Sequence, residues 1–168
     1  MNGKQQAKVV LFSAEQGRAW RGDFGTPTPS LRIDEHYSGL ERQRWFFERV
    51  TSISLHGRGP WWFIRNAESP VAGFVTASAA PTGIGRYAVI LSRQITTDTE
   101  FRTQHWFIEQ FPNQWDPNLP LFPHKIRLWN RQTKAVIAFD PQHVDRPLLA
   151  LTDVSTGNHS QWFANVLP

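Results

Sequence analysis

The 168-residue chain is 40% hydrophobic, with eight Trp and twelve Phe, and contains eleven Gly and twelve Pro. It is too apolar for a disordered protein, and its Pro and Gly residues interrupt every helical window of useful length. The absence of Cys excludes thiol catalysis and Cys-based zinc sites, and permits a cytosolic location without proving one. The composition therefore favours one all-β domain of short strands joined by tight turns.

The charge pattern argues against nucleic acid as a partner. The formal net charge is +4, but the arginines are scattered and form no basic run. Acidic residues stand beside them, as in the Glu-Arg-Gln-Arg segment at 41–44, which is typical of a solvated surface.

We find no apolar run typical of a signal peptide or of a membrane span in this sequence. Residues 1–6 are polar and lack the apolar run of a signal peptide. No stretch approaches the roughly 20 apolar residues of a membrane span. We therefore expect a protein without a membrane span that is cytoplasmic, or secreted without a recognisable signal peptide.

In chain order, the first unit begins with an alternating apolar pair ahead of a polar turn at Ser13. Such period-2 alternation predicts a strand that enters a hairpin. A second strand through Trp20 follows, and a third is predicted at 31–33. The fourth is centred on Trp45, in the segment Gln-Arg-Trp-Phe-Phe-Glu.

This order of elements recurs twice. The fourth strand is centred on Trp106 in the second unit and on Trp162 in the third, so the Trp-to-Trp separations are 61 and 56 residues. The apolar pairs that precede the three turns are Val9 and Leu11, Trp62 and Ile64, and Ile126 and Leu128. The second unit is about eight residues longer, and we assign the extra residues to the small-residue loop at 78–86. Third strands are predicted at 89–91 and 149–151.

Three copies of four strands predict an all-β fold of the β-trefoil type. It would have twelve strands in three pseudo-symmetric four-strand repeats, forming a single domain over 1–168. The repeats cover about 7–50, 60–111 and 124–168, with a linker at 112–123. Six strands would close a short barrel, which removes sheet edges, and three hairpins would cap one end. The three repeated Trp residues are predicted to be buried in the core.

A Gln-x-Trp motif ends the first two units, at Gln43 to Trp45 and Gln104 to Trp106, some thirty to forty residues after a polar turn. This pattern resembles the ricin B-type β-trefoil lectins, and the resemblance covers nearly the whole chain. The third unit departs from it, with Ser160 at the Gln position. Length and the lack of Cys are also similar to β-trefoil proteins of mushrooms, which include sugar-binding lectins and protease inhibitors.

The resemblance implies a three-part sugar site in each repeat. An Asp after the second strand accepts hydrogen bonds from two sugar hydroxyls, an aromatic ring stacks on the pyranose, and an amide near Gln-x-Trp completes the clamp. Repeat one matches best, with Asp23, Tyr37, and Arg42 or Gln43 as the donor. We therefore expect the best carbohydrate site there.

The other two repeats match less well. Repeat three has Asp140, which lies 22 residues before its Trp as Asp23 does, and has Asn158 and His159 downstream, but it lacks the aromatic. Repeat two has Thr76 at the Asp position and is expected to have lost its site, although Tyr87 remains. The alternative role for both aspartates is to fix a turn, beside a Gly in repeat one and a Pro in repeat three.

These features predict a carbohydrate-binding lectin that is not an enzyme and needs no cofactor or metal. The six His residues show no metal-type pairing, and the nucleophile-elbow motif Gly-x-Ser-x-Gly is absent. The expected partners are glycans or glycoproteins, and a homodimer would add a second contact. The alternative is a protease inhibitor that presents a rigid loop at 14–18, 34–41 or 112–123, with Arg18 or Arg42 filling a trypsin-like pocket.

Overall fold

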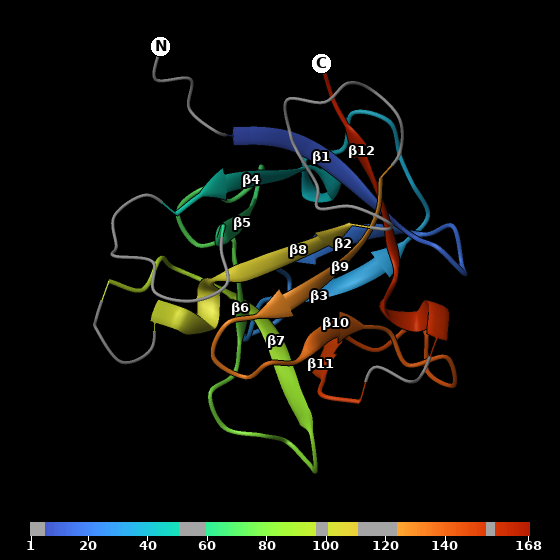
Figure 1. Cartoon of the computed structure of the whole chain (residues 1–168). Coiled ribbons are helices and arrows are strands. Elements are labelled where there is room, and N and C mark those ends of the chain that lie inside the picture. Colours follow the sequence, from blue (N-terminus) through green and yellow to red (C-terminus); the bar gives the residue numbers. More distant parts are fainter. Residues whose placement is uncertain (1–5, 51–59, 97–100, 111–123, 154–156) are drawn as a thin grey trace.

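The computed structural model describes residues 6–50, 60–96, 101–110, 124–153 and 157–168, and the predicted linker at 112–123 lies outside them. The described part is built of strands and three short 3₁₀ helices, η1 (Glu41–Gln43), η2 (Phe101–Gln104) and η3 (Gly157–Ser160) (Figure 1). Its twelve strands are β1 (Gln6–Ser13), β2 (Ala19–Asp23), β3 (Ser30–Asp34), β4 (Trp45–Arg49), β5 (Trp62–Asn66), β6 (Phe74–Ala77), β7 (Arg86–Ser92), β8 (Trp106–Gln110), β9 (His124–Asn130), β10 (Val136–Ala138), β11 (Leu149–Leu151) and β12 (Trp162–Val166). The all-β class and the twelve predicted strands are confirmed.

Six of the strands close into a ring. Antiparallel pairing runs from β1 to β4, β5, β8, β9 and β12, and β12 pairs again with β1. Each of these strands therefore has a neighbour on both sides, which leaves no open edge within the ring. Alternate residues face inward along the strands, so that Leu11, Ile64 and Leu128 are fully buried.

The other six strands form three hairpins, β2–β3, β6–β7 and β10–β11. Strand β7 also pairs with β3 and with β11. The first and third hairpins are joined where the Leu148 amide, just before β11, donates to the Leu31 carbonyl of β3 at 2.7 Å. Strands β7, β10 and β11 lie toward the lower end of the molecule in Figure 1. Within the described residues, no helix is long and apolar enough to cross a bilayer.

The three repeated Trp residues are all fully buried, as predicted. Each indole N–H donates to a backbone carbonyl of the second strand in its own unit. The donor–acceptor pairs are Trp45 to Trp20 at 3.4 Å, Trp106 to Val75 at 2.9 Å and Trp162 to Ile137 at 3.1 Å. A buried indole needs such an acceptor, so these bonds fix each ring at an equivalent place in the core.

The polar turns repeat as well. The side chains of Ser13, Asn66 and Asn130 each accept a hydrogen bond from the amide two residues later. The amide of the residue after each of them donates to the carbonyl of the middle residue of a Gln-x-Trp segment or its counterpart, just before the neighbouring strand of the ring. These segments contain Arg44, His105 and Gln161. The short polar side chain thus satisfies the turn while the backbone links neighbouring units.

The indole bonds correct the placement of the extra residues in unit two. Trp20 is seven positions after Ser13, and Ile137 is seven positions after Asn130, but Val75 is nine positions after Asn66. Two of the extra residues therefore lie in the first turn rather than in the loop at 78–86. Sequence comparison missed this because the turn residues carry no apolar pattern that could reveal a gap.

This shift also changes which residue of repeat two corresponds to the aspartates. Ser78, three residues after Val75, takes the place of Asp23 and Asp140, so the prediction that Thr76 stands there is wrong. The Thr76 hydroxyl is buried and lies 2.8 Å from the Ser92 hydroxyl and 3.0 Å from Gln104 Nε2. It is a structural link between β6, β7 and η2.

Candidate functional site

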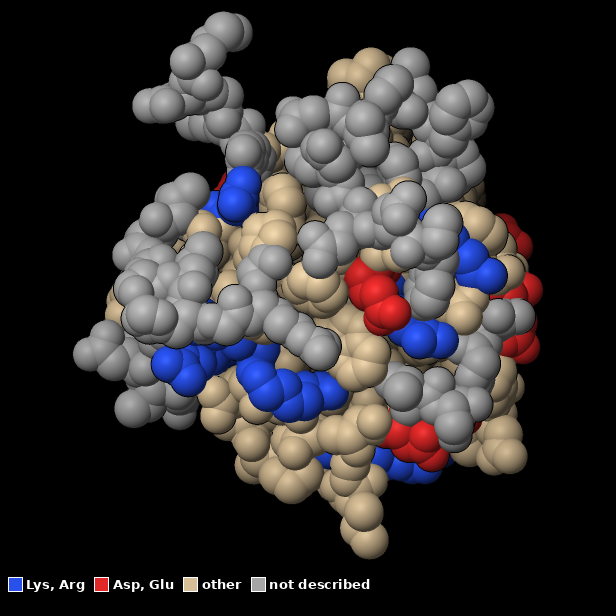
Figure 2. Space-filling model, viewed as in Figure 1, with Lys and Arg blue, Asp and Glu red and all other residues tan. Residues whose placement is uncertain are grey.

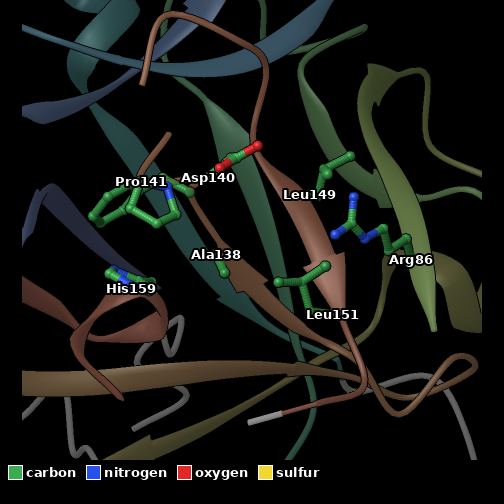
Figure 3. A pocket seen from close by; sticks show the side chains of 8 residues that line it. Arg86, Ala138, Asp140, Pro141, Leu149, Leu151 and His159 are labelled. Atoms are coloured by element: carbon green, nitrogen blue, oxygen red, sulfur yellow. The ribbon is translucent and has the colours of Figure 1, made fainter. Parts of the chain in front are cut away.

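A hollow of about 200 Å³ lies over the β10–β11 hairpin, where β7 and η3 approach it. Figure 3 shows Ala138 between two groups of side chains, with His159 and Pro141 on one side and Arg86, Leu149 and Leu151 on the other. Its lining residues are Arg86, Ala138, Phe139, Asp140, Pro141, Leu149, Leu151 and His159. We refer to it as the repeat-three pocket.

The floor of this pocket follows from strand register. Leu149 and Leu151 are two residues apart on β11 and therefore face the same side, whereas Ala150 between them is fully buried. Leu149 pairs with Ala138 on β10, and Leu151 pairs with Arg86 on β7. Cross-strand partners share a face, so the floor is aliphatic and carries one guanidinium at its edge.

Asp140 supplies the carboxylate of the pocket. Its Oδ1 accepts a hydrogen bond from the Gln142 amide at 2.9 Å, and its Oδ2 lies 2.9 Å from His143 Nδ1. The His143 hydrogen bond, followed by that of the Gln142 amide, holds the pKa of Asp140 below its usual value. Asp140 therefore fixes a turn, the alternative left open by the sequence. Two carboxylate oxygens offer about four acceptor sites, so it can still accept further bonds.

His159 forms the opposite wall. Its ring stands edge-on to the Phe139 ring, with centroids 5.1 Å apart, and its Nδ1 lies 2.6 Å from Glu15 Oε2 of the first turn. The structure therefore brings the predicted residues Asp140 and His159 into one pocket. The side chain of the third predicted residue, Asn158, lies outside the described part of the chain.

The predicted residues of repeat one are arranged differently. Asp23 Oδ1 accepts the Gly25 amide at 3.1 Å, and its Oδ2 forms an ion pair with Arg32 Nε at 2.9 Å. Among the described residues, neither Tyr37 nor Arg42 is a bonding partner of Asp23. Asp23, like Asp140, caps its own turn.

Tyr37 and Gln43 belong to one loop of repeat one. Gln43 is fully buried, and its amide donates to the Glu35 carbonyl and accepts from the Tyr37 amide, at 2.6 and 2.7 Å. Gln43 therefore positions the loop, in place of the sugar contact that we predicted for it. Tyr37 itself is 54% exposed, which leaves its ring open to solvent.

The arginines considered for a protease pocket have acidic partners. Arg42 Nε lies 2.5 Å from Glu68 Oε2, and Arg18 lies 3.7 Å from Asp145. Both pairs are partly solvent-exposed, so they constrain the side chains only weakly. Within the ranges that the structure describes, no group of three His, Asp or Glu side chains is placed to hold a metal ion.

Sequence reasoning missed two features of the repeat-three pocket. The first is Arg86, which belongs to repeat two and reaches the pocket only because β7 pairs with β11. The second is the floor of Leu149 and Leu151, which occupies the stretch where an aromatic ring was expected. The Leu-x-Leu alternation was a usable signal for a strand, but it does not show what lies above the exposed face.

Comparison with known proteins gives the fold but no family. No family model matches the chain, and no curated protein matches it in sequence. Among solved structures, the designed three-fold symmetric protein ThreeFoil has a TM-score of 0.66 at 16% identity, over 95% of this chain and 99% of that one.

Two lectin structures are also similar. The Polyporus squamosus lectin, bound to a Neu5Ac-containing epitope, has a TM-score of 0.67 at 13% identity, over 97% of this chain and 50% of that one. SeviL, bound to the asialo-GM1 saccharide, has a TM-score of 0.56 at 18% identity, over 94% and 95% of the two chains. At these identities the chain shares an all-β, three-fold repeated fold with β-trefoil proteins that include lectins.

Proposed function

We propose that this chain is a β-trefoil lectin of the ricin B-like type, which binds glycans or glycoproteins and catalyses no reaction. The observation that carries the proposal is the repeat-three pocket, where a carboxylate stands over an aliphatic floor. It lies at the position that the ricin B-type resemblance assigns to a sugar. The glycan-bound lectins of similar fold support the same function.

The pocket suits one sugar ring. Its volume of about 200 Å³ is below the roughly 300–1,000 Å³ of sites for drug-sized ligands. A pyranose has an apolar C–H face, which would lie on Leu149 and Leu151. Its hydroxyls would donate to the free acceptor sites of Asp140. His159 would bound the ring on the far side.

A single site of this kind binds weakly. Each hydrogen bond formed replaces one to water and nets only about 0.5–1.5 kcal/mol. We expect millimolar affinity per site. Repeat one is the second site of the proposal, with the exposed Tyr37 ring stacking on a sugar and Asp23 and Arg42 supplying polar contacts. Two sites on one chain, or a homodimer, would raise the avidity.

The test is a glycan array followed by titration of the best ligand against Asp140→Asn and Asp23→Asn. We expect Asp140→Asn to weaken binding at least tenfold and Asp23→Asn to weaken it less. Asp145→Asn is the matched control, because Asp145 is exposed and does not line the pocket. Thermal unfolding checks that each variant is folded. Wild-type binding by both test variants, or no binding to any glycan, would show that the proposal is wrong.

A second candidate function, protease inhibition, is favoured by one observation. Ile84 is fully exposed in the uncharged loop between β6 and β7, where a large apolar side chain is unusual. A rigid loop with such a tip could enter a protease cleft. Assays against trypsin-, chymotrypsin- and elastase-like proteases test it, with Ile84→Asp as the variant that should abolish inhibition.

A further inference from the structure

Arg86 is a cation at the edge of the repeat-three pocket. It is exposed, and within the described residues no carboxylate lies within ion-pair distance of its guanidinium. Many other arginines do have such a partner. The pairs are Arg21–Asp34, Arg32–Asp23, Arg42–Glu68, Arg44–Glu41 and Arg65–Glu48. On the right of the view in Figure 2, acidic and basic side chains lie beside one another, whereas Lys and Arg gather at its lower left without acidic side chains among them. The charge of Arg86 is therefore available to a ligand.

The backbone around Arg86 is held firmly. Its amide donates to the Gly83 carbonyl at 3.2 Å, and its carbonyl accepts from the Thr82 amide at 2.8 Å. The preceding residue, Gly85, has φ of +64°, and a Cβ there would lie 2.3 Å from Thr152 Oγ1. The positive φ and the close Thr152 side chain together favour glycine where the loop approaches the residue after β11. The loop and β11 together fix the point from which Arg86 extends.

Arg86 and Asp140 divide the pocket into two chemically different ends. Figure 3 shows the Arg86 guanidinium extending toward the pocket beside Leu149 and Leu151, away from the His159 side. The Asp140 carboxylate is already hydrogen-bonded by His143 and the Gln142 amide, which compensates part of its charge. One end thus accepts hydroxyl protons, and the other presents a planar cation suited to paired oxygens.

We propose that the repeat-three pocket selects glycans that carry an anionic group, with Arg86 pairing with the carboxylate or sulfate of the sugar. This inference rests on the proposed carbohydrate-binding function and adds the class of sugar. A neutral sugar leaves the guanidinium hydrated, whereas an anionic one forms two parallel N–H···O bonds with it. The group that Arg86 would recognise is a carboxylate, with two free oxygens, or a sulfate ester, with three, on a pyranose.

The experiment titrates matched neutral and anionic sugars by calorimetry. The pairs are galactose with galacturonic acid, galactose with galactose 6-sulfate, and lactose with sialyllactose. We expect wild type to prefer the anionic member of at least one pair by about fivefold or more. The uronate and sialyl pairs report on carboxylate, and the 6-sulfate pair reports on sulfate. Raising the salt concentration should weaken binding of the anionic sugar more than binding of its neutral partner.

The variants isolate Arg86 from the rest of the site. Arg86→Gln should weaken binding of the anionic sugar more than binding of its neutral partner and so reduce the preference to below twofold, and Arg86→Lys should retain part of the preference. Arg93→Gln is the matched control, because Arg93 is exposed near the other end of β7 and does not line the pocket. Equal binding of every pair by wild type, with neutral binding still lost in Asp140→Asn, would overturn this inference and leave the lectin function standing. No binding of the wild type to any of the five sugars would overturn both.

Discussion

Repeats one and three share their centre and differ at their surface. In both, a buried Trp donates a hydrogen bond to a carbonyl of the second strand. An Asp three residues after that carbonyl caps a turn, because its side chain accepts a hydrogen bond from the amide two residues further on. Yet Asp23 forms an ion pair with Arg32, whereas Asp140 stands at an aliphatic hollow. Equivalent positions in a repeated fold thus need not make equivalent sites.

One residue explains much of this difference. Trp20 pairs with Ile33 on β3, and Ile137 pairs with Ala150 on β11, so Arg32 and Leu149 occupy corresponding positions just before these partners. Repeat one therefore places a cation where repeat three places an apolar floor. Arg32 forms an ion pair with the Asp23 carboxylate. Leu149 forms none, so the Asp140 carboxylate can accept hydrogen bonds from its own turn and from a ligand.

The largest expected effect tests whether the two centres are truly alike. Trp45→Ala and Trp162→Ala should each lower the free energy of unfolding by roughly 3–5 kcal/mol, because each leaves a cavity in the core. Urea denaturation measures both. Losses that differ by more than about 2 kcal/mol between the two variants would break the claim of equivalent cores.

In the middle unit, His105 is the residue just before the repeated Trp, at the position of Arg44 in unit one and Gln161 in unit three. Burial, together with the nearby Arg131 and Arg102, lowers the pKa of His105 to about 4. The unfolded chain, with an ordinary His pKa near 6.5, then binds the extra proton first as pH falls. Stability should therefore decline between pH 6.5 and 4, by about 3 kcal/mol, and level off below that range.

Denaturation at pH 7 and pH 4.5 checks this prediction against His105→Gln, which cannot take up the proton. The wild type should lose about 2–3 kcal/mol more than the variant between these pH values. The comparison removes the effect of carboxylates, which titrate in both proteins. Parallel pH profiles would mean that His105 contributes no acid sensitivity.

An exchange of surface residues tests the explanation of the two sites directly. Leu149→Arg should place a cation beside Asp140 and cover the floor, which weakens glycan binding at repeat three about tenfold, or about 1.4 kcal/mol. Arg32→Leu should free Asp23 and leave binding at repeat three unchanged. Titration with the best array ligand measures both. Unchanged binding by Leu149→Arg would contradict the role given to the floor.

The smallest effect is expected in the turns, at Ser13. The Asn130 side chain accepts three hydrogen bonds and donates one to the Thr103 carbonyl at 2.8 Å, whereas the Ser13 hydroxyl accepts two. Asn130→Ala should cost about 1–3 kcal/mol, because it leaves a buried carbonyl unsatisfied, and Ser13→Ala about 1 kcal/mol. Thermal unfolding of the two variants checks the order, and a larger loss for Ser13→Ala would reverse it.

The strands and the repeated core could be predicted from the amino-acid sequence alone. Alternating apolar residues ahead of polar turns indicate which faces are buried, and the three Trp segments indicate the three-fold order, because burial imposes a period that is visible in one dimension. The shared offset of Asp23 and Asp140 from their Trp residues identifies them as equivalent positions. The sequence pattern also indicates His159, which lies in the pocket with Asp140.

The surroundings of these residues depend on contacts between units, which no local pattern records. The pairing of β7 with β11 brings Arg86 of repeat two into the pocket that Asp140 of repeat three also lines. The hydrogen bonds of Gln43 hold its side chain against the Tyr37 loop. The two-residue gap that moves the equivalence from Thr76 to Ser78 is visible in the indole bonds of the folded chain. Periodicity reports burial along a strand, whereas a site on a repeated fold forms between units, where the partners are distant in sequence and share no period.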